Sequence, residues 1–176
     1  MKLVVQNLLA AALLLLATTC QAVKVGDSIP TDVELHFGFP PENINLSQRI
    51  ASKKVILELG IDEVIVFCVN DGAVMNAWAL DQNVPTDSII KLMGDPYAVL
   101  TEKLDMELTH AGPKSVGLVN RCKRHALYIV NGSVKIVRVA EKDDDPAGDD
   151  FPDITLAGSM IEAIKELRSS SPKEEL

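Results

Sequence analysis

Cysteine is the residue of this chain best suited to covalent chemistry, and it occurs at Cys20, Cys68 and Cys122. A cysteine reacts as its thiolate, and nearby positive charge lowers the thiol pKa. Cys122 stands in Arg121-Cys122-Lys123-Arg124-His125 and is therefore the candidate reactive thiol. If this stretch is a strand, Cys122 and Arg124 face the same side. The alternative is that Cys122 is only a small residue that serine could replace.

Cys68 lies in an apolar run and is expected to be a structural, unreactive thiol in the core. In an oxidising compartment it could form a disulfide with Cys122, but only if the fold brings the two together. These two cysteines alone are too few for a disulfide framework.

The acidic stretch at residues 143–150 suggests a calcium-binding loop. An EF-hand loop starting at Asp143 would need an oxygen ligand at Ala147 and a glutamate at Ile154, so that motif fails. We interpret the stretch as a solvated loop, with weak calcium binding as the alternative. The histidines also lack metal-ligand spacing, and we expect no metal and no cofactor. They are His36, His110 and His125.

Strand and helix patterns alternate along the chain. Apolar, β-branched runs at 55–57, 64–69, 126–130 and 134–139 predict strands, and alternation at 33–37 predicts an edge strand that Pro40-Pro41 ends. Asn131-Gly132 predicts a type I′ hairpin turn. A short helical turn is expected at 45–50. This order predicts an α/β domain with a mixed sheet and helices on both faces.

Three longer helices are predicted, two of them with aspartate caps. Asp71 would cap a helix at 71–80, and Asp95 would cap a helix at 97–104 that has Pro96 at its first position. The third is expected at 159–168.

Four stretches resemble the peroxiredoxin family, in its type II, or atypical two-cysteine, subfamily. They are Lys24-Val25-Gly26-Asp27-x-x-Pro30, Val69-Asn70-Asp71 with Val74 and Trp78, Gly94-Asp95-Pro96, and residues 121–125 running into the Asn131-Gly132 hairpin. The resemblance implies a thioredoxin-like fold, the reduction of hydrogen peroxide and alkyl hydroperoxides, and a role in redox homeostasis. It also implies thioredoxin, glutaredoxin or glutathione as reductant, and a possible homodimer.

The segment that carries the family's chemistry has no counterpart in this sequence. The family opens a helix with Pro-x-x-x-Thr-x-x-Cys after a strand that resembles residues 53–57, and no such stretch exists here. The peroxidatic cysteine is therefore absent, and we predict a chain inactive as a peroxidase. Arg124 matches the family's active-site arginine.

Only Glu58-Leu59-Gly60 separates that strand from the next one. Parallel neighbours need a crossover of about a dozen residues or more. One strand–helix unit is thus missing after Leu57, and the thioredoxin-like sheet should be incomplete. A splice form, a gene-model error and a true deletion all explain the junction. The alternative functions are a redox-sensitive binding protein of the endoplasmic reticulum, using Cys122 or a Cys68–Cys122 disulfide, and a product without function.

The chain ends suggest targeting signals. Residues 1–22, with Lys2, the apolar run 8–17 and Cys20-Gln21-Ala22 as cleavage site, predict a signal peptide, with an uncleaved anchor or a lipidated Cys20 as minor alternatives. A redoxin domain is expected at 23–168 and a polar tail at 169–176. The tail ends in a KDEL-like retention signal, Lys173-Glu174-Glu175-Leu176. We therefore predict the lumen of the endoplasmic reticulum, or secretion as the alternative.

A chain that enters the lumen also exposes two glycosylation sequons, at Asn45 and Asn131. The second lies in a predicted tight turn and is the less favoured of the two. The formal net charge of −8 argues against binding to nucleic acid or to anionic membrane surfaces, and no membrane contact is expected after signal cleavage.

Overall fold

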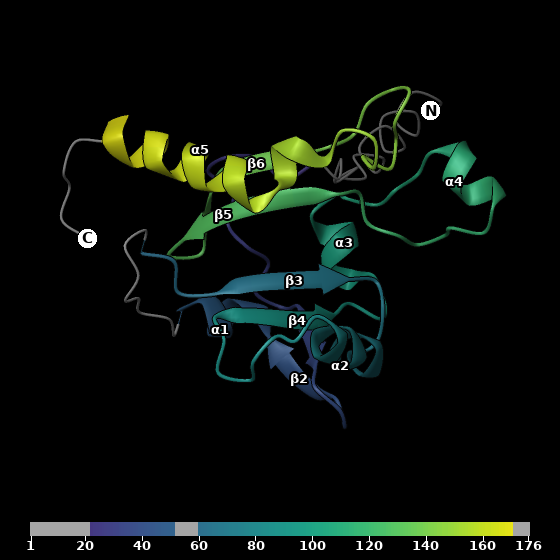
Figure 1. Ribbon diagram of the computed structural model, residues 1–176, viewed down its shortest axis with the longest axis horizontal. Coiled ribbons are helices and arrows are strands. Elements are labelled where there is room, and N and C mark those ends of the chain that lie inside the picture. The colour runs from purple at the N-terminus through teal and green to yellow at the C-terminus, as the bar shows by residue number, and fades with distance from the viewer. Residues whose placement is uncertain (1–21, 52–59, 171–176) are drawn as a thin grey trace, which may run out of the picture.

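The structure is a computed structural model that describes residues 22–51 and 60–170 (Figure 1). Several sequence-based assignments fall outside these ranges. They are the signal peptide up to residue 21, the strand at 55–57 with most of the junction that follows it, and the retention signal Lys173-Glu174-Glu175-Leu176. These assignments stay predictions.

Within the described residues, four strands form a mixed sheet in the order β2-β1-β4-β3. They are β1 (Glu34–Phe37), β2 (Glu42–Asn45), β3 (Val64–Cys68) and β4 (Ile90–Gly94). β3 and β4 run parallel, whereas β1 is antiparallel to both β2 and β4. The prediction of β1 as an edge strand is therefore wrong, because the unpredicted strands β2 and β4 flank it on both sides.

A separate hairpin contains β5 (His125–Val130) and β6 (Ser133–Val139). Asn131 and Gly132 both have positive φ, 50° and 76°. The predicted hairpin with two left-handed turn residues is confirmed.

The helices are α1 (Leu46–Ala51), α2 (Gly72–Asp81), α3 (Val99–Lys103), α4 (Ala111–Ser115) and α5 (Ala157–Ser170), with a short 3₁₀ helix η1 (Pro152–Thr155). Asp71 is the N-cap of α2, and its Oδ1 accepts the backbone N–H of Val74 at 2.9 Å, as predicted. α3 begins later than predicted. Its N-cap is Ala98, in the left-handed region, and not Asp95.

The hairpin lies between two apolar clusters. One face of it, with Leu127, Ile129 and Val134, joins the main core beneath β1, β4 and α3. The opposite face, with Tyr128 and Ile136, packs against α5 around Ile164. Figure 1 shows α5 along the hairpin and α2 beside β4. Side chains alternate along β5, and a register shift between Tyr128 and Ile129 brings Val134 opposite Ile129 and Ile136 opposite Tyr128, so that one hairpin packs against both clusters.

The expected single sheet is divided in two among the described residues. β3 is paired only with β4, and β5 only with β6. Figure 1 shows no described strand between β3 and β5. The rings of Phe67 and His125 meet across this division, with centroids 5.4 Å apart. The architecture is that of an incomplete mixed α/β sheet with flanking helices.

Candidate functional site

The two described cysteines are neighbours at the carboxyl end of β3. Cys68 is the last residue of that strand, and Cys122 forms an isolated antiparallel bridge with Glu107. Arg121 Nη1 donates to the carbonyl oxygen of Val69 at 3.0 Å, which ties the two segments together. The charge of Cys68 and the N–H of Val69 both act on the Cys122 thiol. Both cysteines are free thiols.

Neither thiol is in an activating environment. Burial raises the pKa of Cys122, and the nearby Cys68 and Asp95 raise it further, against smaller lowering contributions from backbone N–H groups. Burial also raises the pKa of Cys68, while Arg121 opposes that shift. Reactive cysteines in proteins have lowered pKa values. Both side chains are therefore protonated thiols at neutral pH.

Arg124 lies apart from the thiols in its contacts. Its Nη2 donates to Asp149 Oδ1 at 2.9 Å, and the side chains are 42% and 70% exposed. The expectation that Cys122 and Arg124 share one face of a strand is wrong, because β5 begins only at His125. The charge of Arg121, by contrast, does act on a thiol, because it lowers the pKa of Cys68. Only the position of Arg121 beside Cys122 in the sequence could have drawn attention to it.

His125 lies in the division between the two sheets. Its Nδ1 is 2.9 Å from the carbonyl oxygen of Lys123, so Nδ1 carries the proton in the neutral ring. Its Nε2 is buried and has no hydrogen-bond partner among the described residues. Burial lowers the pKa of His125 and keeps the ring neutral.

Asp95 fixes the turn after β4 to the thiol end of β3. It is 1% exposed, and its carboxylate accepts the N–H groups of Leu100 at 3.2 Å and Thr101 at 2.9 Å, and the Thr101 hydroxyl at 2.9 Å. Its own N–H donates to the Cys68 carbonyl at 2.8 Å. The preceding Gly94 has no room for a Cβ, which would overlap the carbonyl oxygen of Asn70.

The acidic stretch is organised by one residue. Asp145 is only 5% exposed, and its carboxylate accepts the N–H groups of Asp149 at 3.0 Å, Asp150 at 3.1 Å and Phe151 at 3.3 Å. The interpretation as a fully solvated loop is therefore too simple. Among residues 22–51 and 60–170, no group of three His, Cys, Asp or Glu side chains could hold a metal ion.

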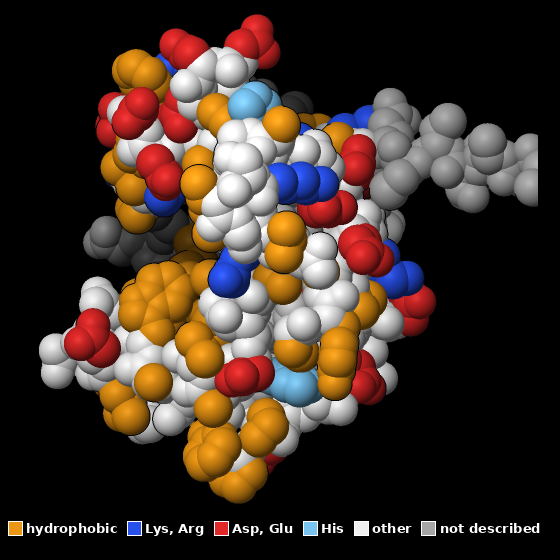
Figure 2. Space-filling model, turned by 90° about the vertical axis from the view of Figure 1, so that its right-hand side faces the viewer, with side chains coloured by type: hydrophobic (Ala, Val, Ile, Leu, Met, Phe, Trp, Pro, Cys, Tyr) orange, Lys and Arg blue, Asp and Glu red, His pale blue; other side chains and the backbone are white. Residues whose placement is uncertain are grey.

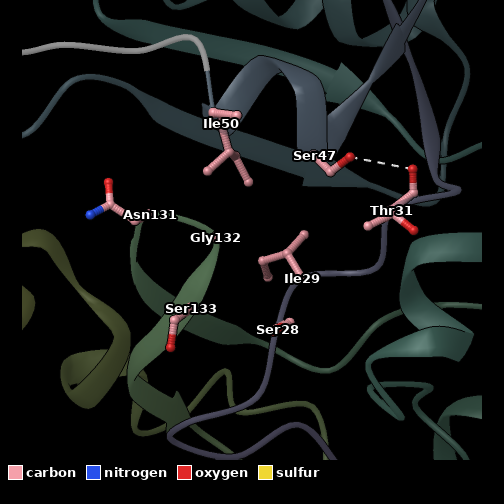
Figure 3. A pocket seen from close by; sticks show the side chains of 9 residues that line it. Ser28, Ile29, Thr31, Ser47, Ile50, Asn131, Gly132 and Ser133 are labelled. Atoms are coloured by element: carbon pink, nitrogen blue, oxygen red, sulfur yellow. Dashed lines mark hydrogen bonds between the residues drawn. The ribbon is translucent and has the colours of Figure 1, made fainter.

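A small hollow lies at the turn of the hairpin (Figure 3). It has a volume of about 220 Å³ and is lined by residues before β1, by residues of α1 and by the hairpin turn, namely Ser28, Ile29, Thr31, Ser47, Ile50, Ala51, Asn131, Gly132 and Ser133. Ser47 Oγ donates to the Thr31 carbonyl at 3.3 Å across its rim. Figure 1 shows this turn and the thiol end of β3 at opposite ends of the molecule. The hollow is therefore separate from the cysteine pair.

No family model matches the chain. Curated plant proteins are similar to it. Peroxiredoxin-2C of Arabidopsis thaliana is 38% identical over 99 residues, 56% of this chain and 54% of that protein. Peroxiredoxin-2C of Oryza sativa subsp. japonica is 30% identical over 101 residues, 57% of this chain and 56% of that protein. The chain thus spans about half the length of these relatives.

Solved structures share the fold. Reduced Prx3 from Vibrio vulnificus in complex with hydrogen peroxide matches with a TM-score of 0.67 and 23% identity, over 83% of this chain and 98% of that chain. Peroxiredoxin 5 from Alvinella pompejana matches with a TM-score of 0.62 and 22% identity, over 82% and 99%. The chain is thus similar in sequence to plant type II peroxiredoxins over about half of its length, and it shares the fold of solved peroxiredoxins.

Proposed function

We propose that this chain is a peroxiredoxin relative that does not reduce peroxides. The observation that carries the proposal is the lack of any Pro-x-x-x-Thr-x-x-Cys stretch in the sequence. A peroxidatic cysteine must attack as a thiolate, and the departing oxygen needs positioned donors. The pKa values of Cys68 and Cys122 are both raised, chiefly by burial, so neither thiol is a substitute.

The arginine that matches the family's active site supports the same proposal. Arg124 is paired with Asp149 at a partly exposed position, and neither thiol is held in the thiolate form by it. We propose that Arg124 stabilises the acidic loop and has no catalytic role in this chain.

The test is a peroxide assay on the purified full chain with hydrogen peroxide and dithiothreitol. An intact plant type II peroxiredoxin is the positive control, and the double variant Cys68→Ser/Cys122→Ser is the baseline. We expect wild-type protein to match the baseline. A thiol-dependent rate within tenfold of the positive control would sink the proposal.

A second candidate function is a redox-responsive protein with a Cys68–Cys122 disulfide. The specific observation in its favour is that the two free thiols are neighbours in the fold. Cys68 directly precedes Val69, and the backbone N–H of Val69 acts on the Cys122 thiol. A small disulfide such as glutathione disulfide would supply the oxidant. The sulfur–sulfur bond of glutathione disulfide breaks, a sulfur–sulfur bond between Cys68 and Cys122 forms, and two glutathione thiols leave with the two protons of the protein thiols. Thioredoxin, glutaredoxin or glutathione, the reductants implied by the resemblance, would reverse the reaction.

Mass spectrometry after alkylation of free thiols tests this candidate. Oxidised wild-type protein should resist alkylation at both cysteines, whereas Cys68→Ser should leave Cys122 either free or bound to one glutathione. Full alkylation of both thiols after oxidation removes this candidate and leaves a chain without a redox role.

The expected homodimer has support from α2. This helix exposes Val74 and Trp78, which are 47% and 41% exposed. Figure 2 shows apolar side chains gathered on the lower part of the face where Figure 1 places α2. α2 therefore carries apolar side chains on its exposed side as well as around the buried Met75. Such a helix is normally covered on both sides, and a second copy of the chain would cover its exposed side. Light scattering of wild type and Trp78→Glu tests the dimer, which the charge should split into monomers.

We further propose the lumen of the endoplasmic reticulum as the location, with secretion as the alternative. The support is the N-terminal pattern at residues 1–22 together with the final Lys173-Glu174-Glu175-Leu176. In the described part of the chain, no helix is both long and apolar enough to cross a membrane. Deleting the last four residues should convert a retained protein into a secreted one, as measured by immunoblot of cells and medium.

A further inference from the structure

The fold treats the two glycosylation sequons differently. N-linked glycosylation attaches a bulky sugar to the Asn side-chain nitrogen and therefore requires a surface site. At Asn45 that nitrogen is already in use, because Nδ2 donates to the Thr31 carbonyl at 3.0 Å. Its Oδ1 accepts the Ser47 hydroxyl at 2.9 Å and the Gln48 N–H at 3.0 Å. The Asn45 side chain thus holds the start of α1.

The rest of that first sequon is equally committed to the fold. Leu46 is a core residue with 5% exposure. The Ser47 hydroxyl, which the sequon needs, lies within hydrogen-bonding distance of both the Thr31 carbonyl and Asn45 Oδ1. A glycan on Asn45 would have to displace this network at the junction of β2 and α1.

Asn131 has none of these restraints among the described residues. It is exposed at the apex of the β5–β6 hairpin, and no hydrogen bond to its side chain is found in the described part of the chain. Figure 3 shows its amide directed away from Ser28 and Thr31. The hollow of about 220 Å³ beside the turn leaves open space next to it.

We infer that Asn131, and not Asn45, carries an N-linked glycan. The inference rests on the proposed entry into the endoplasmic reticulum and reverses the preference that the sequence alone suggests. The donor is a lipid-linked oligosaccharide diphosphate. The bond from the sugar C1 to the phosphate oxygen breaks, a bond from C1 to Asn131 Nδ2 forms, and one Nδ2 proton is released with the lipid diphosphate.

The experiment translates the full chain in the presence of endoplasmic reticulum microsomes. Sensitivity to peptide N-glycosidase reports the glycan, and protection from added protease reports entry. Asn131→Asp and Asn45→Asp are matched variants that remove each acceptor nitrogen. Aspartate tolerates the left-handed turn position at 131, and it keeps the acceptor oxygens that cap α1 at 45.

We expect wild type and Asn45→Asp to show one glycosidase-sensitive shift and Asn131→Asp to show none. A shift that persists in Asn131→Asp, or that disappears in Asn45→Asp, overturns the inference. So does a protected chain without any glycan, although entry would then stand.

A chain that is not protected contradicts the proposed location instead. The same variants are then translated behind a known cleavable secretory signal. Under that leader, the same single shift at Asn131 supports the inference, and its absence overturns it.

Discussion

Two buried aspartates, Asp95 and Asp145, each accept hydrogen bonds that order a turn or loop, but in different parts of the fold. Each places a carboxylate against three donor groups, at the turn after β4 and in the loop after β6. Each also lies near a glycine that has no room for a Cβ. Beside Asp95, a Cβ on Gly94 would overlap the carbonyl oxygen of Asn70, and three residues after Asp145, a Cβ on Gly148 would overlap that of Ala140. They differ in what they join. Asp95 links β3, β4 and α3 inside the main core, whereas Asp145 orders only its own loop.

The two aspartates accept equal numbers of hydrogen bonds but differ in how distant in sequence the segments are that they join. The Asp95 N–H also holds the Cys68 carbonyl, and Leu100 and Thr101 are core residues. The donors around Asp145 are its near neighbours in sequence. Global stability should therefore depend on Asp95, and loop order on Asp145.

The largest expected effect is that of Asp95→Ala. It leaves buried donors of Leu100 and Thr101 unpaired, which should lower the free energy of unfolding by about 3 kcal/mol. Urea denaturation measures the change. Asp95→Asn, which keeps one acceptor oxygen, should lose less. Equal losses for the alanine and asparagine variants would contradict the proposed role of the hydrogen bonds.

The second-largest loss of stability is expected for Gly148→Ala. Gly148 has φ of 72° in addition to the crowding by Ala140, so Gly148→Ala should destabilise by about 1–3 kcal/mol. Gly158→Ala is the control, because its Cβ meets nothing within 4 Å and it lies in α5, where alanine should stabilise by about 1 kcal/mol. Thermal unfolding of both variants gives the comparison. If Gly148→Ala leaves the melting temperature unchanged, the backbone of the loop after β6 shifts to accommodate the added Cβ without a cost in stability.

Asp145→Asn should act locally. Burial alone would raise the pKa of Asp145, but the N–H groups of Asp149, Asp150, Phe151 and Gly148 lower it on balance. Its stabilising contribution is then complete above its unfolded pKa, near 3.9, and is lost as the pH falls through the lower folded pKa. The variant should be cut faster by protease within 143–151 at neutral pH. A global fall in stability as large as that of Asp95→Ala would break the comparison.

The smallest effect concerns His125, whose buried Nε2 has no hydrogen-bond partner within residues 22–51 and 60–170, unlike the carboxylates of the two aspartates. Burial lowers its pKa, so its contribution to stability is present above the unfolded pKa, near 6.5, and is lost as the pH falls through the folded value. His125→Phe should flatten the melting temperature between pH 7 and pH 5. An unchanged pH profile would show that His125 is not the group that titrates.

The sequence predicts best what depends on local chemistry. The β5–β6 turn, the Asp71 cap and the runs that became β3, β5 and β6 all follow from neighbouring residues. β2, which reads Glu-Asn-Ile-Asn, and β4 carry no clear strand pattern. Pairing with β1 makes β2 a strand, and pairing with β3 on one side and β1 on the other makes β4 one.

The candidate site was less predictable for the same reason. Its neighbourhood of Cys68, Cys122 and Val69 joins segments far apart in the sequence. The pairing of Arg124 with Asp149, rather than with a thiol, depends on where the loop after β6 returns. Nothing in residues 121–125 indicates that β5 starts as late as His125.

The position of the β5–β6 hairpin between two clusters also bears on how the chain folds. Its strands are joined by two residues, so they can pair early at a small loop-closure cost, whereas β1 must find β4 across a long stretch of chain. The hairpin then presents one apolar face to each cluster. We expect changes at Gly132 to slow refolding and changes in β1 mainly to speed unfolding.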